Sequence, residues 1–379
     1  MNAAAKPKVA IVCDWLTGIG GAERVVYELH KLYPDAPIYT SQYDSSKIDW
    51  FADADVRTTW LQTLPKSLKK FLPLLRAWTF SRLDLSEYDL VISSSGAEAK
   101  GVHTGKNTIH ICYCHSPTHY YWVRYDEYLQ NPGFPRGFNW LARLGLKLLV
   151  DPLKRWDRRA AKGPDYMIAN STHTQANIKR FYRRDSTVIH PPVETDRFRI
   201  KGPAKPPLRH GFVMAGRQTP YKRFDLAIEA CDQLKIPLVV IGDGPDHTRL
   251  EKLADKLPGR GTTFLTNTND TEIVDHFQSA LGFIMPNMDD FGIVAVEAMA
   301  AGTPVIAYNK GGALDYVIPG KTGLFFDKQN PKSLASELEA AAAKSWNHEA
   351  IAAQAENFSV TAFTKSIQEF IKQVSERNS

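Results

Sequence analysis

The sequence predicts an α/β protein with two doubly wound domains, each a parallel sheet covered by helices on both faces. Three observations favour this fold. Short β-branched runs alternate with helical periodicity along the chain. Prolines crowd at residues 190–210 (HPPVETDRFRIKGPAKPPLRH), as in a linker between two such series. The 379 residues exceed what one core usually organises, which indicates two domains.

The first domain is predicted at residues 1–195. It opens with an apolar strand at residues 8–13, a loop at 14–21 and a helix from about Ala22. Further strands are predicted at residues 90–93, 108–114 and 166–169. Because helical or irregular stretches separate these strands, we expect them to be parallel.

The second domain is predicted at residues 205–358, with strands at residues 212–215, 238–241, 263–265, 281–285 and 305–308. The chain ends in an amphipathic helix at residues 361–376, and we expect residues 361–379 to pack back on the first domain. Two such domains that face a central cleft would bind a ligand at the carboxyl ends of their strands.

Composition and charge narrow the classes of function. With 43% hydrophobic and 23% charged residues the chain is typical of a soluble globular protein, without a signal peptide or spanning helix. Its four cysteines form no disulfide framework, which predicts a reducing cytoplasm. Residues 1–200 hold 28 Lys and Arg against 20 Asp and Glu (+8), and the rest hold 19 against 21 (−2). The basic half indicates an anionic partner such as a lipid surface or a phosphorylated acceptor, and no nucleic-acid-binding motif is present.

A glycine and two cations follow the first strand of the second domain, in VMAGRQTPYKRFDLAIEA. Gly216 lets a ligand approach the backbone, while Arg217 and Lys222 are placed to converge on a diphosphate. An isolated pair of this kind is more often a solvated basic loop. In the first domain Gly20 and Gly21 precede a helix whose free N–H groups can bind an anion, but their spacing does not match a dinucleotide-binding fingerprint.

The stretch DDFGIVAVEAMAAGTPVIA (289–307) places carboxylates around the start of a helix predicted to begin at residues 292–294. Asp289 and Asp290 lie in the preceding loop, where they also suit the helix dipole. Glu297 lies among Ala, Val and Met, where an unpaired carboxylate would be costly. Because carboxylates accept hydrogen bonds from vicinal hydroxyls, one could hold a hexose and the other a ribose.

These motifs resemble the retaining glycosyltransferases of family 4 across nearly the whole chain. The shared residues are, in chain order, GGAERVV (20–26), YCHSP (113–117), ANS (169–171), AGR followed after four residues by KR (215–223), Asp289, Glu297 with AMAAGTPVIA (297–307), GG (311–312) and PGKTGLFF (319–326). The resemblance implies the GT-B fold, with two Rossmann-like domains, the donor nucleotide on the second domain and the acceptor mainly on the first.

The resemblance also implies residue roles. Arg217 and Lys222 would grip the donor diphosphate, Glu297 the ribose hydroxyls and Asp289 the transferred sugar, with His115 beside the anomeric centre. The residues expected to bind the donor are Gly20, Gly21, Gly216, Arg217, Lys222, Asp289, Asp290, Phe291, Gly292, Ile293, Val294 and Glu297.

This chain departs from the family at two acids. Asp289 stands where the family usually has glutamate, so its carboxylate is one methylene further from the sugar. Asp315 likewise stands where a glutamate often follows GG. The family's reaction proceeds on one face of the sugar, and the departing phosphate takes the acceptor proton. Fixed cations and a helix start would carry the leaving charge, so no metal or other cofactor is expected.

Several other patterns resemble functional motifs but also have a simpler structural explanation. Asp53-Ala54-Asp55 imitates a metal-binding DxD but is interpreted as a surface loop, and Cys112 and Cys114 as strand residues rather than zinc ligands. His173, after a helix cap, is given no chemical role. Residues 60–78 (WLQTLPKSLKKFLPLLRAW) combine apolar residues at helical spacing with cations, which fits an interfacial membrane helix and a core-packed segment equally well.

Within the family, DDFGIVAVEAMAAG and RWDRRAAKGPDYMIANS (155–171) are most similar to bacterial mannosyltransferases of O-antigen and related surface polysaccharides. The resemblance implies GDP-mannose as donor, a polyprenyl-diphosphate-linked saccharide as acceptor, and peripheral contact with the cytoplasmic face of the inner membrane. Three alternatives stay open: a UDP-sugar-dependent transferase of the same family, a sugar-nucleotide epimerase of the same architecture, and a non-catalytic nucleotide-sugar binder.

Overall fold

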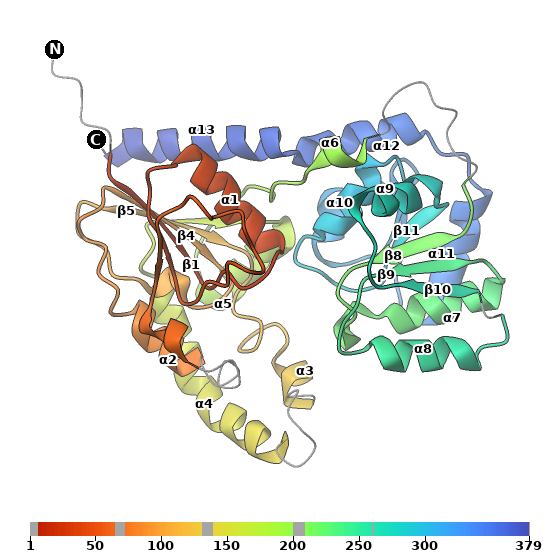
Figure 1. Ribbon diagram of the computed structural model, residues 1–379, viewed down its shortest axis with the longest axis horizontal. Helices are drawn as coiled ribbons and strands as arrows, with labels where there is room; N and C mark the ends of the chain where they lie inside the picture. Colours follow the sequence, from red (N-terminus) through yellow and green to blue (C-terminus); the bar gives the residue numbers. More distant parts are fainter. Residues whose placement is uncertain (1–6, 65–72, 131–138, 200–208, 260, 379) are drawn as a thin grey trace. The chain divides into compact units, whose positions relative to one another are not determined.

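The computed structural model describes residues 7–64, 73–130, 139–199, 209–259 and 261–378. The chain divides into two compact units (Figure 1). Unit 1 comprises Met1–Pro191 together with Thr364–Ser379, and unit 2 comprises Pro192–Phe363. Each unit contains one sheet with helices on both faces, so each is described by itself.

Unit 1 is built on a seven-stranded sheet in the order β3-β2-β1-β4-β5-β6-β7, and every pairing is parallel. The strands are β1 (Val9–Cys13), β2 (Ile38–Thr40), β3 (Val56–Thr58), β4 (Leu90–Ser95), β5 (Ile109–Cys114), β6 (Tyr166–Ala169) and β7 (Thr187–Val188). The central strands β1 and β4 are buried along their whole length, as expected for a parallel sheet covered on both faces. The strand order reverses between β1 and β4, so the loops that follow these two strands are natural ligand positions.

Within the described ranges, unit 1 has six helices and two short 3₁₀ turns. They are α1 (Gly21–Leu32), η1 (Trp60–Thr63), α2 (Pro73–Phe80), η3 (Ala99–Gly101), α3 (Tyr125–Gln130), α4 (Asn139–Ala160), α5 (Thr172–Tyr182) and the C-terminal α13 (Val360–Asn378). Ser171 caps α5 by accepting a hydrogen bond from the Thr174 N–H. The ring of Phe370 on α13 packs edge-on against Tyr166 of β6, with 6.1 Å between centroids.

Unit 2 has a six-stranded parallel sheet in the order β10-β9-β8-β11-β12-β13. The strands are β8 (Phe212–Ala215), β9 (Leu238–Ile241), β10 (Thr262–Leu265), β11 (Gly282–Met285), β12 (Val305–Tyr308) and β13 (Gly323–Phe326). Alternate residues enter opposite cores: Phe283 and Val305 pack on one face, and Ile284 and Ile306 on the other. The order reverses between β8 and β11, which places the loops after these strands side by side.

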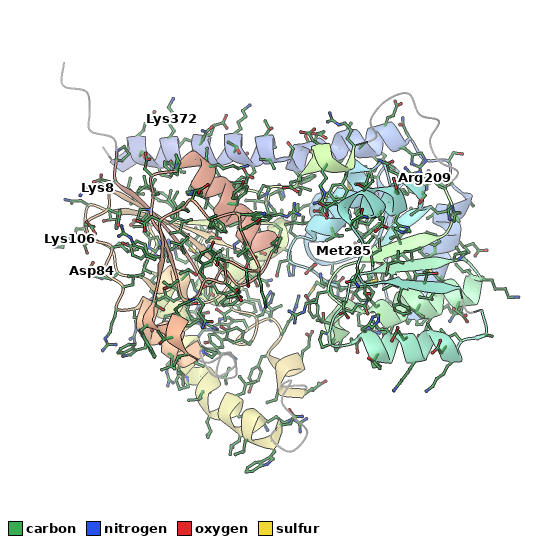
Figure 2. The ribbon with its side chains drawn as sticks, viewed as in Figure 1. Lys8, Asp84, Lys106, Arg209, Met285 and Lys372 are labelled. Atoms are coloured by element: carbon green, nitrogen blue, oxygen red, sulfur yellow. The ribbon has the colours of Figure 1, made fainter. Side chains whose placement is uncertain are left out.

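The helices of unit 2 cover both faces of its sheet (Figure 1). They are α6 (Thr195–Phe198), α7 (Phe224–Leu234), α8 (His247–Lys256), α9 (Asp270–Ser279), α10 (Ile293–Ala300), α11 (Pro331–Ala343) and α12 (His348–Ala355), with 3₁₀ turns η5 (Pro220–Lys222), η6 (Gly311–Asp315) and η7 (Glu356–Phe358). Arg209, labelled in Figure 2, joins the segment before β8 to the ends of α9 and α10. Its guanidinium donates to the carbonyls of Phe277 and Ala280 at the end of α9 and of Ala301 at the end of α10.

The predicted fold class, two Rossmann-like doubly wound domains, is confirmed. Four strands were not predicted, namely β2, β3, β7 and β13. The first three have only two or three residues, too few to show a period. The predicted linker contains the short helix α6. Residues 200–208 of the linker lie outside the described part of the chain.

The predicted amphipathic stretch at residues 60–78 is only partly described, since residues 65–72 lie outside the described ranges. Its described ends form η1 and the beginning of α2. Asp53 to Asp55 form an exposed turn in which Asp55 pairs with Arg57, so the surface-loop interpretation is confirmed. Within the described ranges, no helix has both the length and the apolar content needed to cross a membrane.

Candidate functional site

In unit 2, the loops after β8 and β11 are joined by an ion pair between Lys222 and Asp289. Lys222 ends the turn η5, and Asp289 lies in the loop before α10. Both side chains are largely covered, with 22% and 19% exposure. The fold thus brings together a cation and a carboxylate that are 67 residues apart, at the edge of the sheet where a doubly wound fold binds its ligand.

The loop from Asp289 to Gly292 is shaped by close backbone packing. The Gly312 N–H donates to the Asp289 carbonyl (2.9 Å), and a side chain at Gly312 would overlap the backbone of Asp290 and Phe291. At Gly292 the backbone has φ +96°, and an added Cβ would lie 2.6 Å from Met285 Cε, the side chain beneath the loop (Figure 2). Glycine is therefore required at both positions.

Helix α10 starts directly after this loop, with Gly292 as its N-cap and Ile293 as its first residue. Its first N–H groups have no partner within the helix, which gives this end a partial positive charge. Glu297, one turn further, is buried at 7% exposure among apolar residues of the same helix. The loop and the start of α10 thus offer N–H donors and the carboxylates of Asp289 and Glu297, and the loop after β8 adds the cation Lys222 at Asp289.

The loop after β8 contributes an exposed cation and room for a ligand. Gly216 has φ +138°, and a Cβ there would meet nothing within 4 Å. Arg217 follows it and is exposed; with the described residues it makes no hydrogen bond or ion pair. An approaching diphosphate would therefore find an uncommitted guanidinium beside an open stretch of backbone.

Sequence reasoning did not identify two polar side chains of this region. Asn287 is 3% exposed, and its Nδ2 has no hydrogen-bond partner among the described residues. The buried Oγ1 of Thr219, between Arg217 and Lys222, is also without a partner in the described structure. Buried polar groups normally have partners, so both atoms are exceptions within the described structure. The position of Asn287 just beyond β11 was the signal that could have revealed it.

In unit 1, the loops after β1 and β4 are tied together by Asp14, which sequence reasoning also missed. Its carboxylate accepts hydrogen bonds from the backbone N–H groups of Gly96 (2.7 Å), Ala97 (2.9 Å) and Ala99 (2.7 Å). Asp14 occupies, with its own charge, an N–H cluster that would otherwise attract an anion. The glycine loop that follows Asp14 is thereby fixed to the neighbouring strand.

Gly20 is the N-cap of α1, and Gly21 is the first residue of that helix. The side chain of Glu23 folds back over this turn: a Cβ on Gly20 would lie 2.8 Å from Glu23 Oε2. Burial, together with the nearby charge of Asp14, raises the pKa of Glu23 to about 7. A carboxyl group that titrates near neutrality therefore covers the start of α1.

This raised pKa predicts a pH-dependent stability. The folded chain holds a proton on Glu23 that the unfolded chain releases above its ordinary pKa of 4.5, so the free energy of unfolding falls as pH rises towards 7. We expect Glu23→Gln, which cannot ionise, to remove this part of the decline. Urea unfolding of both proteins from pH 4.5 to 8 measures it. Parallel curves for the two proteins would contradict the assignment.

His115 follows β5 and is held by the end of β4. Its ring Nε2 is 2.7 Å from Ser94 Oγ, and its backbone N–H donates to the Ser95 carbonyl at 3.0 Å. The imidazole also packs against the ring of Tyr113, with 5.2 Å between centroids. Both contacts fix the ring at the carboxyl edge of the sheet in unit 1. Cys112 and Cys114 are buried in β5, which confirms that they are strand residues.

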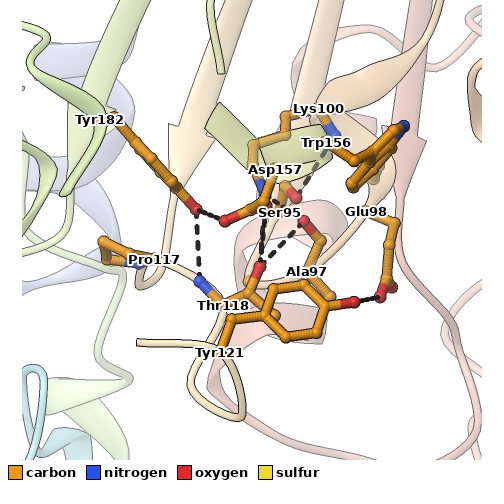
Figure 3. Close-up of polar contacts among 12 residues, drawn as sticks. Ser95, Ala97, Glu98, Lys100, Pro117, Thr118, Tyr121, Trp156, Asp157 and Tyr182 are labelled. Carbon is orange, nitrogen blue, oxygen red and sulfur yellow. Dashed lines mark hydrogen bonds and ion pairs between the residues drawn. The ribbon is translucent and has the colours of Figure 1, made fainter. Parts of the chain in front are cut away.

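A buried network of polar side chains holds the segment that follows His115 (Figure 3). The Asp157 carboxylate on α4 pairs with Lys100 Nζ at 2.7 Å, and both side chains are at most 1% exposed. The same carboxylate accepts hydrogen bonds from Thr118 Oγ1 (3.1 Å), Tyr182 OH (2.8 Å) and Trp122 Nε1 (2.7 Å). Although burial alone lowers the pKa of Lys100, its pairing with Asp157 raises that pKa above the ordinary value. Asp157 thus connects α4 to η3, to α5 and to the segment that follows His115.

A second buried carboxylate braces the same segment from η3. Glu98 accepts hydrogen bonds from Arg76 Nε (2.8 Å) and Tyr120 OH (2.6 Å). Burial raises the pKa of Glu98, and Arg76 opposes that rise. None of these residues was singled out from the sequence, because their partners lie 22 to 57 positions away.

The predicted site residues fall into two groups. Gly20, Gly21 and His115 belong to unit 1, and the other ten belong to unit 2. Within unit 2 the structure brings Lys222 and Asp289 into contact and places Asp290 to Val294 and Glu297 in the same loop and helix start. Among the described residues, no three His, Cys, Asp or Glu side chains cluster as a metal site would require.

Comparison with known proteins finds family models over both units. The model described as Glycosyltransferase Family 4 matches residues 19–197, and the model described as Glycosyl transferases group 1 matches residues 196–358. Together the two models cover residues 19–358.

Two relatives illustrate what the chain is similar to. It is 31% identical over 205 residues to a GDP-mannose-dependent alpha-(1-6)-phosphatidylinositol monomannoside mannosyltransferase of Mycobacterium tuberculosis, covering 48% of this chain and 53% of the relative. It is also 31% identical over 210 residues to a D-inositol 3-phosphate glycosyltransferase of Streptomyces scabiei, covering 48% and 47%. The chain therefore spans about half the length of the curated relatives it matches.

Solved structures show the same fold. Anabaena Alr3699/HepE in complex with UDP and glucose matches with a TM-score of 0.69 at 19% identity, over 97% of this chain and 100% of that one. Sucrose-phosphate synthase from Thermosynechococcus elongatus matches with a TM-score of 0.72 at 17% identity, over 98% and 100%. With the two parallel sheets described above, these likenesses establish the GT-B fold.

Proposed function

We propose that this chain transfers a hexose from a nucleotide sugar to an acceptor, because it belongs to glycosyltransferase family 4. The observation that carries the proposal is the contact between Lys222 and Asp289 beside the start of α10. A nucleotide sugar has a diphosphate next to a polyhydroxylated ring, and this site offers a cation next to a carboxylate. Each half of the donor thus finds a partner of suitable chemistry.

Bond cleavage between the sugar and the diphosphate places negative charge on the leaving group. Arg217, Lys222 and the N–H groups at the start of α10 stabilise that charge in a preorganised site. Asp289 accepts hydrogen bonds from hydroxyls of the transferred sugar, and Glu297 from those of the ribose. When a donor arrives, Lys222 exchanges part of its pairing with Asp289 for the diphosphate.

The proposed reaction retains the configuration at the anomeric carbon, and the departing phosphate takes the proton of the acceptor hydroxyl. By resemblance to the family, His115 is the residue of unit 1 that we propose to act on the transferred sugar. The two cations meet the electrostatic demand that a divalent metal would otherwise meet, so the proposed mechanism requires no metal or other cofactor.

The proposed donor is GDP-mannose, which the printed name of the Mycobacterium tuberculosis relative specifies for that protein. The proposed acceptor is a polyprenyl-diphosphate-linked saccharide in the synthesis of a bacterial surface polysaccharide such as O-antigen. The proposed location is the cytoplasm, with peripheral contact at the inner membrane. The basic first half of the chain supports such an anionic acceptor. The Anabaena structure with UDP and glucose supports the alternative of a UDP-sugar donor.

Thermal unfolding with a panel of GDP- and UDP-sugars, with and without EDTA, tests the donor. We expect GDP-mannose to raise the melting temperature selectively, because a ligand at about 100 times its Kd stabilises the folded state by about 2.7 kcal/mol. EDTA is expected to leave the shift unchanged.

Each other outcome rejects a different part of the proposed function. Preference for a UDP-sugar would keep the mechanism and reject mannose transfer, and a shift lost in EDTA would reject the metal-free mechanism. Product analysis then separates the classes of activity. A transferase extends an acceptor, an epimerase alters the sugar and a binder leaves it unchanged.

A further inference from the structure

The first half of α4 presents an apolar face to solvent. Trp140 is 61% exposed and Leu148 is 67% exposed, and Leu141, Leu144 and Leu149 are also exposed. Trp140, Leu144 and Leu148 recur every four residues, so they lie along one side of the helix. The helix extends well beyond the sheet of unit 1 (Figure 1). Isolated exposed leucines are ordinary, but a row of large apolar residues on a protruding helix indicates a binding surface.

The exposed half is held rigidly by the rest of unit 1. In the second half of α4, Val150 and Leu153 are buried, and Asp157 anchors the helix through Lys100. Near the other end, the Arg143 guanidinium donates to the carbonyls of Leu129 (3.0 Å) and Gln130 (2.8 Å), which ties α4 to the end of α3. The apolar face is therefore a fixed feature of the folded unit.

The same helix is strongly basic. It carries six cations against two acidic residues: Arg143, Lys147, Lys154, Arg155, Arg158 and Arg159 against Asp151 and Asp157. The charge of Asp157 is already neutralised by Lys100. Arg155 and Arg159 are exposed and lie seven and eleven residues beyond Leu148, on the same side of the helix. The face is thus apolar towards its free end and cationic towards the body of unit 1.

We propose that this face of α4 docks unit 1 on an anionic lipid surface. The leucines and Trp140 enter the boundary between headgroups and acyl chains, and the cations contact the headgroups. Leu74, Leu75 and Trp78 on α2 are exposed as well, and the end of α2 contacts the second half of α4, because Trp156 Nε1 donates to Ser81 Oγ at 3.0 Å. The sequence left residues 60–78 open between a membrane contact and core packing, and residues 65–72 of that stretch lie outside the described ranges.

Charge distinguishes a lipid surface from a second copy of the chain. In a symmetric dimer built on this face, the cations of each helix would lie opposite the cations of the other if the helices ran parallel, and opposite its leucines if they ran antiparallel; neither arrangement supplies counter-charges. A second copy of the helix would thus leave the cations without counter-charges, whereas anionic headgroups supply them. Membrane docking would bring the enzyme to a lipid-linked acceptor. Only this purpose of the docking rests on the proposed function.

Co-sedimentation of the full chain with vesicles tests the proposal. We expect binding to phosphatidylcholine vesicles that contain phosphatidylglycerol, weaker binding to phosphatidylcholine alone, and a decline with added salt. Leu144→Glu with Leu148→Glu should lower the partition coefficient at least about tenfold, because two apolar side chains no longer leave water. Lys147→Ser with Arg155→Ser should lower it about tenfold and weaken its salt dependence.

Ile318→Glu in unit 2 is the matched control, because Ile318 is a similarly exposed apolar residue (38%) on another surface. It should bind vesicles like the parent protein. Equal vesicle binding by the Leu144/Leu148 variant, or no binding by the parent, overturns the proposal. A dimer that the same leucine substitutions dissociate, without vesicle binding, assigns the face to a second copy. Stabilisation of every variant by GDP-mannose is measured in parallel, so a failure of the donor proposal is separately visible.

Discussion

Lys222→Ala is expected to lower turnover by about 10² to 10³, the effect typical of removing one preorganised group that stabilises developing charge. Lys222 is well placed for such an effect because it is largely covered, paired with Asp289 and next to the start of α10. In that setting its charge is screened less by water than that of a surface lysine. Arg217→Ala should have an effect of the same order. Release of GDP from GDP-mannose in the presence of membrane lipid extract measures turnover.

The matched control is Arg223→Asn, at the residue directly after Lys222. Arg223 pairs with Asp225 at 3.1 Å rather than with the predicted donor loop. Its backbone has φ +56°, a conformation that asparagine tolerates better than alanine. Turnover of this variant should change little. If Lys222→Ala and Arg217→Ala both keep full turnover while folding normally, the donor site is elsewhere.

Binding and chemistry can be separated in the same series. If Lys222 acts mainly on the leaving group, the variant loses kcat more than it loses affinity for the intact donor. If the dominant role of Lys222 is instead to hold Asp289 in place, Asp289→Asn should reproduce most of the loss. The two readouts therefore distinguish a catalytic cation from a positioning cation.

The buried strands of the fold could be predicted from sequence because their signal is local. Residues 166–169, 212–215 and 238–241 are continuous apolar runs bounded by polar, glycine or proline residues, and the structure has β6, β8 and β9 at these positions. The strand β13 (Gly323–Phe326) was not predicted, although its residues were noted for the motif PGKTGLFF.

Much of the predicted site in unit 2 was also local in sequence. The residues from Asp289 to Glu297 form one loop and one helix start, so their proximity followed from the sequence alone. The pairing of Lys222 with Asp289 did not, because it depends on β8 and β11 being neighbours at the point where the strand order reverses. The role of Gly312 is similar, since only the structure shows it packed against Asp290.

Long-range polar contacts escaped prediction altogether. The Asp14 carboxylate bonds to N–H groups 82 to 85 residues away, and in sequence it is one acid after a strand. Asp157 is one residue in the charged run KRWDRR, which suggests a solvated helix. Its burial depends on Lys100, Thr118 and Tyr182 arriving from three other segments. No pattern along the chain indicates that these side chains contact one another.

Asp157→Ala is expected to lower the free energy of unfolding by about 3 to 5 kcal/mol, the usual cost of leaving one member of a buried ion pair without its partner. The Lys100 ammonium, 1% exposed, would lose its only counter-charge at 2.7 Å among the described residues. Thr118, Tyr182 and Trp122 would lose their acceptor as well. Urea unfolding, followed by far-ultraviolet circular dichroism, measures the change.

Asp185→Ala is the matched control, because Asp185 pairs with Lys179 in the same unit at 2.6 Å while its side chain is 91% exposed. An exposed pair of this kind contributes little, so no measurable change is expected. The double variant Asp157→Leu with Lys100→Met then separates two causes. If the unpaired ammonium dominates the cost, removing it recovers much of the lost stability. If the double variant is as unstable as Asp157→Ala, the loss comes instead from the hydroxyl and indole donors that fix the segment after His115, and the ion pair is secondary.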